Sequence, residues 1–226
     1  LEQKIDQILH RSDYIKKQEA LKKAAYDKFY QAAETLHELR VEKAKTLEQQ
    51  IVSQLRDLHL ENARFHVEIH THEGNRQGID HVQFLISMNK GEALRALQTT
   101  ASGGELSRLM LGLKTIFSRL QGIETIIFDE IDTGVSGGVA FAIGKKMQQL
   151  SKDTQVFCVT HLSQVAACAD HHFLVEKSQN EQGTTTAIRE LSNEERVEQL
   201  ALIASDSTSE HALSAARELL TKAQSK

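Results

Sequence analysis

Two carboxylates and a histidine stand where they could act together on a phosphate group. The apolar residues 125–128 end in Asp129 and Glu130, and a second apolar segment, residues 155–160, is followed by His161. Both segments have the composition of strands that are buried on both faces. Since consecutive strand residues point to opposite sides, one carboxylate could face a Mg²⁺ ion while the other faces an attacking water. The alternatives are a solvated strand end and an incidental histidine.

A helix has to connect the two strands if these groups are to converge. Residues 138–150, which lie between the strands, carry apolar side chains at helical spacing. A strand–helix–strand unit crosses over right-handed and places the carboxyl ends of both strands at one sheet edge, where open α/β sheets bind ligands. We therefore expect Asp129, Glu130 and His161 to lie at the same edge.

A glycine-rich helix start precedes these strands. Ser102 is followed three residues later by Glu105, which predicts a capping box at the start of an amphipathic helix. Gly103 and Gly104 each cost about 1 kcal/mol of helix stability relative to alanine. Without side chains there, a phosphate could reach the free N–H groups at the positive end of the helix dipole. The alternative is a capped helix whose glycines only allow close packing.

Together these segments resemble ABC-type ATPases. Residues 102–105 are similar to the signature motif of that family, residues 126–130 to its Walker B strand, Asp132 to its D-loop aspartate and His161 to its switch histidine. Three longer strings, residues 101–108, 128–137 and 159–167, resemble the RecN family of bacterial SMC-like DNA-repair ATPases. The resemblance is close over residues 63–226, and before them it rests only on the helical pattern.

The resemblance implies an α/β fold: the carboxyl-terminal lobe of an ABC/SMC-type ATPase head with a mainly parallel sheet and β-hairpins, preceded by a long coiled-coil arm. It implies ATP and Mg²⁺ as cofactors, with Asp129 holding Mg²⁺ through water and Glu130 and His161 acting in catalysis. Ser102, Gly103, Gly104 and Glu105 would bind ATP held by the opposite subunit of a homodimer, with nucleotide sandwiched between the paired heads. The implied role is the repair of DNA double-strand breaks at the bacterial nucleoid in the cytoplasm.

The sequence contains half of such a site. A phosphate-cradling loop, a glycine-rich run that ends in Gly-Lys-Ser or Gly-Lys-Thr, is not found in these 226 residues. We therefore expect a fragment that is inactive alone and that lacks an amino-terminal lobe. Two other classes stay open: another ABC-type ATPase, such as a transporter subunit, and a non-catalytic coiled-coil interaction module.

Composition limits the other functions. The net charge of −4 gives no electrostatic argument for nucleic-acid binding. The two cysteines, Cys158 and Cys168, show no metal-ligand spacing and are interpreted as buried structural thiols in a reducing cytoplasm. We find no signal peptide and no apolar run of membrane-spanning length, so no membrane association is expected.

Residues 1–62 form the predicted arm. Apolar residues recur at three-four spacing among charges of both signs, which is typical of one side of a coiled coil. The spacing slips near Ser12 and Asp13, where a new helix could begin. An apolar seam needs a cover, so we expect an antiparallel partner helix from a segment outside this sequence. The alternative is a surface helix that bridges solvent.

Residues 63–226 form the predicted lobe. Alternating apolar residues flank the turn-rich residues 73–78 and predict a β-hairpin. His66, His70 and His72 share one face of its first strand, which we interpret as an exposed polar face; the alternative is a metal site. A second hairpin is predicted across residues 173–188, where it would extend one edge of the sheet. Two amphipathic helices follow, at about residues 193–204 and 209–223.

Overall fold

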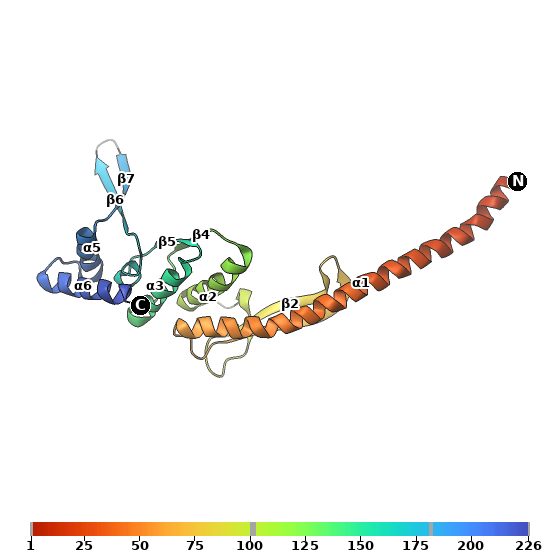
Figure 1. Cartoon of the computed structure of the whole chain (residues 1–226), viewed down its shortest axis with the longest axis horizontal. Helices are drawn as coiled ribbons and strands as arrows, with labels where there is room; N and C mark the ends of the chain where they lie inside the picture. The colour runs from red at the N-terminus through yellow and green to blue at the C-terminus, as the bar shows by residue number, and fades with distance from the viewer. Residues whose placement is uncertain (1, 100–102, 181–182, 226) are drawn as a thin grey trace.

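The long arm is one unbroken helix. The computed structural model describes residues 2–99, 103–180 and 183–225 of the chain. Helix α1 (Glu2–Asp57) runs away from the rest of the molecule, with the amino terminus at its far end (Figure 1). The helix break predicted near Ser12 and Asp13 is wrong. Neither residue is glycine or proline, and the small propensity cost of such residues does not interrupt a long helix.

The second half of α1 packs on the first β-hairpin. Strands β1 (Arg64–Asn75) and β2 (Gly78–Ser87) pair antiparallel, and the short β3 (Arg95–Ala96) pairs with β2. The predicted hairpin is confirmed. Its apolar face joins α1 and α2 (Gly103–Gln121) in one core, which includes Ile51, Leu55, Phe65, Val67, Ile86 and Leu109.

Helix α1 ends in a Schellman motif. The backbone N–H of Leu60 donates to the carbonyl of Leu55 at 2.9 Å, and that of His59 donates to Arg56 at 3.0 Å. His59 has a left-handed φ of 59°, a conformation that glycine usually supplies at this position. Leu55 and Leu60 are both buried, which provides the apolar contact that accompanies the motif. The end of the arm is therefore fixed at a defined residue.

The predicted strand–helix–strand unit is present. Strand β4 (Thr125–Asp129) is followed by α3 (Gly137–Leu150) and β5 (Gln155–Val159), and the two strands pair parallel, from Thr125 opposite Gln155 to Asp129 opposite Val159. Helix α3 covers one face of this pair. The resulting core includes Leu111, Ile126, Phe128, Ile143 and Leu150.

The expectation that these strands are buried on both faces is wrong within this chain. Alternate residues of the strands are exposed: Ile127 by 68% and Val159 by 61% of their surface. An alternating pattern arises because α3 packs on one face only, while the sequence is apolar on both. The second apolar face of the two strands is therefore uncovered in the part of the chain that the structure describes.

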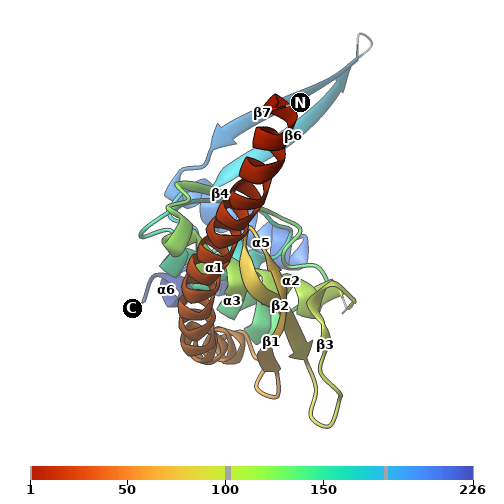
Figure 2. The ribbon, with the colours of Figure 1, turned by 90° about the vertical axis from the view of Figure 1, so that its right-hand side faces the viewer.

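The carboxyl-terminal part adds a hairpin and two helices. After the short α4 (Ser163–Ala166), strands β6 (Phe173–Asn180) and β7 (Gly183–Glu190) pair antiparallel and project from the body (Figures 1 and 2). The hairpin is confirmed, but its predicted place is wrong: β6–β7 is a separate two-stranded sheet in the described structure. Both predicted helices are present, as α5 (Asn193–Ser205), which opens with a capping box, and α6 (Glu210–Gln224).

Candidate ATPase site

The predicted convergence at one sheet edge is found. Asp129 is the last residue of β4 and pairs in register with Val159, the last residue of β5, so Glu130 and His161 follow at the same edge. Asp129 and Glu130 are exposed, and the His161 side chain is 70% exposed. These groups are accessible to a ligand at the edge where α/β sheets bind one.

The backbone after β4 turns sharply at Glu130. Its φ is 53°, in the left-handed region that costs a non-glycine residue about 1–2 kcal/mol. Two hydrogen bonds hold the turn: the N–H of Thr133 donates to the Glu130 carbonyl at 3.2 Å, and the Thr133 hydroxyl donates to the same oxygen at 2.9 Å. Backbone strain of this kind concentrates at functional sites.

Asp132 lies inside the protein and faces the loop after β5. Its surface is fully buried. The Thr160 hydroxyl donates a hydrogen bond to Asp132 Oδ2, and the same hydroxyl oxygen accepts from the N–H of Leu162 at 3.0 Å. His161 Nδ1 lies 3.7 Å from Asp132 Oδ1. Sequence reasoning missed Thr160, although a hydroxyl residue directly before the histidine was a visible signal.

The start of α2 lies against the loop that follows β4. A Cβ atom at Gly104 would come within 3.1 Å of the Thr133 carbonyl oxygen and 3.3 Å of that of Gly134. A side chain at residue 104 would crowd these two carbonyl oxygens, so the glycine serves close packing, the alternative weighed from the sequence. Ser102 lies outside the described residues, so the capping box between Ser102 and Glu105 stays a prediction. Gly103 is the first residue of α2, and Glu105 places a negative charge in its first turn, where the dipole favours it.

Arg108 ties this helix start to the end of the arm. Its Nε donates to the carbonyl of Gly104 at 3.2 Å, and its Nη1 donates to the carbonyl of Leu58, just beyond α1, at 3.2 Å. Burial lowers the pKa of Arg108, and the nearby Glu105 partly offsets this. A cation at a helix carboxyl terminus satisfies a free carbonyl and complements the dipole. No pattern in the sequence predicts this contact.

Both cysteines are protonated structural thiols. Burial, together with the negative charges of Asp132 and Asp129, raises the pKa of Cys158 to about 12. Burial raises the pKa of Cys168 to about 11, against the lowering effect of Lys145 and Arg196. A thiol with a raised pKa is a poor nucleophile and a poor metal ligand at neutral pH. Neither cysteine therefore competes for a role in the chemistry of this site.

The donor set at the sheet edge suits Mg²⁺ bound together with a nucleotide. Mg²⁺ keeps several waters and usually takes one or two protein carboxylates plus phosphate oxygens. The exposed Asp129 can supply such a carboxylate. Across the described residues, no group of three or more histidine, cysteine or acidic side chains could hold a metal by itself. Of the three histidines considered as metal ligands on β1, His66 pairs with the arm helix: its Nδ1 lies 2.8 Å from Oε1 of Glu48 in α1.

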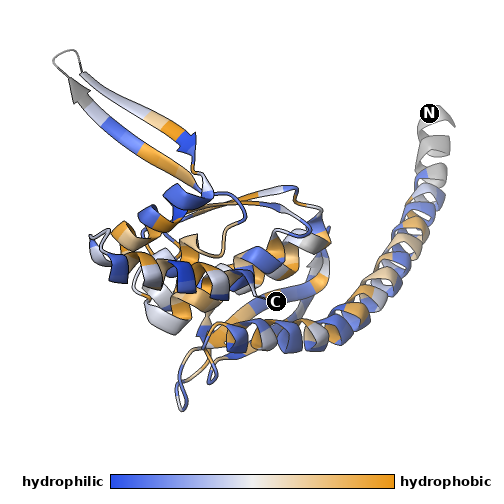
Figure 3. Ribbon diagram, turned by 60° about the vertical axis from the view of Figure 1, so that its left-hand side comes forward, coloured by the Kyte–Doolittle hydropathy of each residue, from blue (hydrophilic) through white to orange (hydrophobic). Residues whose placement is uncertain are grey.

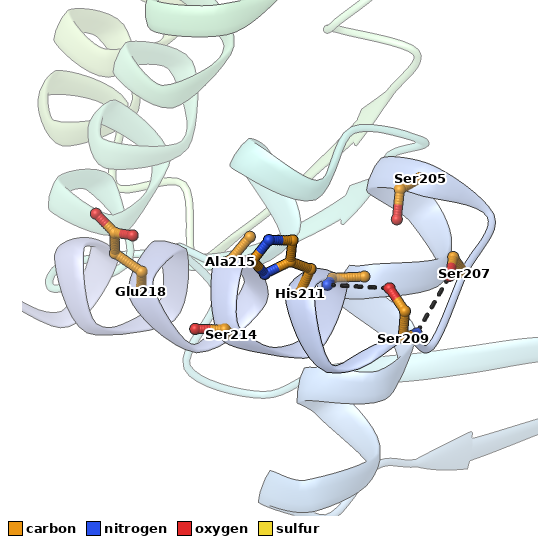
Figure 4. A pocket seen from close by; sticks show the side chains of 8 residues that line it. Ser205, Ser207, Ser209, His211, Ser214, Ala215 and Glu218 are labelled. Carbon is orange, nitrogen blue, oxygen red and sulfur yellow. Dashed lines mark hydrogen bonds between the residues drawn. The ribbon is translucent and has the colours of Figure 1, made fainter.

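A shallow depression at the start of α6 is a separate feature. Figure 4 shows its serine side chains. Two of them serve local turns: the Ser209 hydroxyl oxygen accepts from the N–H of Ala212 at 3.4 Å, and that of Ser207 accepts from the N–H of Ser209 at 3.1 Å. None of the candidate residues at the β4–β5 edge lines this depression.

Solved structures of SMC heads share this fold. The Smc head domain of Pyrococcus yayanosii, solved with a coiled coil and joint, superposes with a TM-score of 0.52 over 83% of this chain and 30% of that chain, at 15% identity. The Smc head of Pyrococcus furiosus with an extended coiled coil gives a TM-score of 0.52 over 74% of this chain and 39% of that chain, at 17% identity. The fold is that of an SMC-type ATPase head with a coiled-coil arm.

Sequence relatives are more specific. The DNA repair protein RecN of Halalkalibacterium halodurans is 43% identical over 232 residues, and that of Bacillus subtilis is 39% identical over 241 residues. This chain belongs to the RecN family. The matches take in 100% and 99% of this chain but 41% and 42% of the relatives, so the chain spans about two fifths of their length. No protein-family model matches it. No helix in the described residues is long and apolar enough to cross a membrane.

Proposed function

We propose that this chain is the carboxyl-terminal part of an SMC-like ATPase that hydrolyses ATP between paired heads during DNA double-strand-break repair. One observation carries the proposal. The parallel register of β4 and β5 brings Asp129, Glu130 and His161 to one sheet edge. The glycine-rich start of α2 lies against the loop that follows β4. Such an arrangement can hold a metal ion, a nucleophilic water and a phosphate.

The three groups at the edge have different proposed roles. Asp129 holds Mg²⁺ through water, and Glu130 orients or deprotonates the attacking water. His161 donates a hydrogen bond to the γ-phosphate, which an imidazole N–H can do. Asp132 belongs to the loop next to the paired head. ATP and Mg²⁺ are the cofactors.

The remaining parts of the site come from outside this chain. The exposed β4–β5 face, with Ile127, Phe157 and Val159, is the proposed contact surface for an amino-terminal lobe that brings the phosphate-cradling loop. Exposed apolar patches of this kind mark interaction surfaces. The length that the relatives have beyond this chain is sufficient for such a lobe.

The free part of α1 is proposed to pair with a second helix. Apolar residues are interspersed with hydrophilic ones along it (Figure 3), and Tyr14, Ile15, Leu21 and Tyr26 are exposed. A partner segment from the same protein would cover this seam as an antiparallel coiled coil.

Ser102, Gly103, Gly104 and Glu105 are proposed to contact ATP bound to the opposite subunit, so that nucleotide joins two heads into a homodimer. DNA is the proposed partner, because the relatives are DNA repair proteins. The net charge of −4 does not support DNA contact by this part of the chain.

Turnover by the full-length protein tests the proposal. We expect ATP hydrolysis by the full-length protein, loss of hydrolysis in Glu130→Gln, and no more activity than buffer for the 226-residue chain alone. Glu124→Gln is the matched control, since Glu124 is an exposed carboxylate at the opposite end of the same strand. A Glu130→Gln protein that hydrolyses ATP at the wild-type rate would rule out the catalytic assignment of Glu130, whereas a wild-type full-length protein without hydrolysis would favour a non-catalytic coiled-coil module.

A further inference from the structure

The burial of Asp132 is the starting point. This carboxylate is fully buried, although aspartate is almost never fully buried unless it is paired. It sits three residues after the strand that carries Asp129, on a loop whose other polar groups are exposed. A buried carboxylate in such a loop costs stability unless its oxygens are used.

The two oxygens of Asp132 are used differently. Oδ2 accepts a hydrogen bond from Thr160, whereas Oδ1 is buried and makes no hydrogen bond within the described residues. The ring nitrogen Nδ1 of His161 lies 3.7 Å from Oδ1. This distance is slightly too long for a hydrogen bond, and catalytic hydrogen bonds are often long until substrate is bound.

Thr160 fixes the histidine loop to the loop after β4. Its hydroxyl donates to Asp132 and accepts from the N–H of Leu162. Thr160 and Leu162, the two neighbours of His161 in the chain, are therefore both connected to the buried carboxylate. The backbone of His161 is therefore held on both sides. Only the imidazole itself, which is 70% exposed, is left to be oriented.

We propose that Asp132 is a positioning residue for His161 of the same subunit. The carboxylate attracts a proton to Nδ1 and thereby fixes the orientation of the ring, so that the imidazolium, which carries a proton on both nitrogens, donates from Nε2 on the other side of the ring to the phosphate. A carboxylate that orients a histidine in this way is a common device in enzymes and at metal sites. The inference rests on the proposed ATPase function. It gives Asp132, on the loop after β4 that is proposed to lie next to the paired head, a role within its own subunit.

A double-mutant cycle in the full-length protein tests the coupling. We expect Asp132→Asn to lower kcat by about 10-fold to 100-fold, with KM for ATP changed by less than about 2-fold. In a His161→Ala background, the same substitution should change kcat by less than about 2-fold, because a residue that acts through His161 has nothing left to position. Equal losses in both backgrounds would overturn the proposal.

Thr160 supplies a second, milder test if Asp132→Asn folds poorly. Thr160→Val removes the bridging hydroxyl and should lower kcat, whereas Thr160→Ser keeps it and should recover most of the loss. The control is Thr154→Val, at the other end of the same strand, where the buried hydroxyl donates to the Ile123 carbonyl at 3.2 Å. It should lower stability without lowering kcat. If Thr160→Val and Thr154→Val affect kcat equally, Thr160 is structural only and the proposal fails.

A readout without turnover separates this inference from the proposed function. In full-length protein carrying ¹⁵N-labelled histidine, the His161 resonances, identified by their absence in His161→Gln, should show that Nδ1 holds a proton. Asp132→Asn removes the charge that attracts this proton and should lower the protonated fraction at Nδ1. An unchanged fraction would overturn the positioning role even if the protein hydrolyses ATP. Conversely, a wild-type protein without ATPase activity would defeat the proposed function while leaving the result at Nδ1 valid.

Discussion

Lys146 Nζ lies 2.6 Å from Asp57 Oδ2, so a side chain of α3 binds the last residue of the arm helix. Lys146 is buried, whereas the Asp57 side chain is 54% exposed. An acidic residue at the carboxyl terminus of a helix is unfavourable to the dipole, and the lysine offsets this. Together with Arg108, which donates to the Leu58 carbonyl, Lys146 joins the end of the arm helix to α2 and α3.

The two partners of this pair should respond differently to substitution. Asp57→Asn leaves a buried ammonium without its counter-charge and should lower the free energy of unfolding by about 1–3 kcal/mol. Lys146→Met keeps the volume and removes the charge, so its effect should be smaller. Urea denaturation measures both. Glu42→Gln, in the exposed pair with Lys43, is the control and should change stability by less than about 0.5 kcal/mol. Equal losses for Asp57→Asn and Lys146→Met would contradict this account.

Gly144 is expected to tolerate no side chain. A Cβ there would lie 2.8 Å from Cys168 Sγ and 3.2 Å from the Gln164 carbonyl oxygen, so α3 and α4 would have to separate. Gly144→Ala should lower stability by about 1–3 kcal/mol despite the higher helix propensity of alanine. Gly138→Ala in the same helix is the control, because nothing lies within 4 Å of its Cβ position. Thermal denaturation should show Gly138→Ala unchanged or stabilised and Gly144→Ala destabilised, with partial recovery on adding Cys168→Ala.

Stability should fall in alkali partly through Cys158. Burial and the carboxylates of Asp132 and Asp129 raise its pKa from 9.0 to about 12. Above pH 9 the unfolded thiol loses its proton while the folded thiol keeps it, so stability is fully present below pH 9 and is lost as pH rises towards 12. Cys158→Ala should therefore flatten the decline in urea midpoint between pH 8 and about 10.5. An identical decline in the variant and the wild type would show that the thiol does not contribute.

Helices and strands could be predicted from the sequence because their signals, apolar periodicity and turn residues, lie within the element itself. The strand–helix–strand unit and its carboxyl-end residues follow from apolar runs and connection geometry, so Asp129, Glu130 and His161 could be placed at one edge without a structure. The same patterns did not predict which face is covered. Ile127 and Phe128 are both apolar in sequence, yet only Phe128 is buried, because α3 packs on the face that carries Phe128 and no described element covers the face that carries Ile127.

Long-range polar contacts could not be predicted. The partner of Asp132 is Thr160, 28 residues away, and Arg108 reaches Leu58 across 50 residues. Each contact depends on the packing of whole elements, for which a single sequence has no periodic signal. The second hairpin was misplaced for a related reason. The two strands of a hairpin pair with each other whether or not an outer edge joins a further strand, so the hairpin pattern does not say whether it extends a neighbouring sheet.

The division of labour between the adjacent carboxylates gives the last prediction. In the full-length protein, Glu130→Gln should retain Mg²⁺-dependent ATP binding and lower kcat by about 10²-fold or more, because only the water-activating group is changed. Asp129→Asn should in addition weaken ATP binding in Mg²⁺, since the metal loses its carboxylate. Fluorescent-nucleotide titration with Mg²⁺ and with EDTA measures this difference. In EDTA the two variants should bind nucleotide alike, which serves as the internal control. If both variants lose Mg²⁺-dependent binding to the same extent, the carboxylates act as one metal site and the separate roles of Asp129 and Glu130 are wrong.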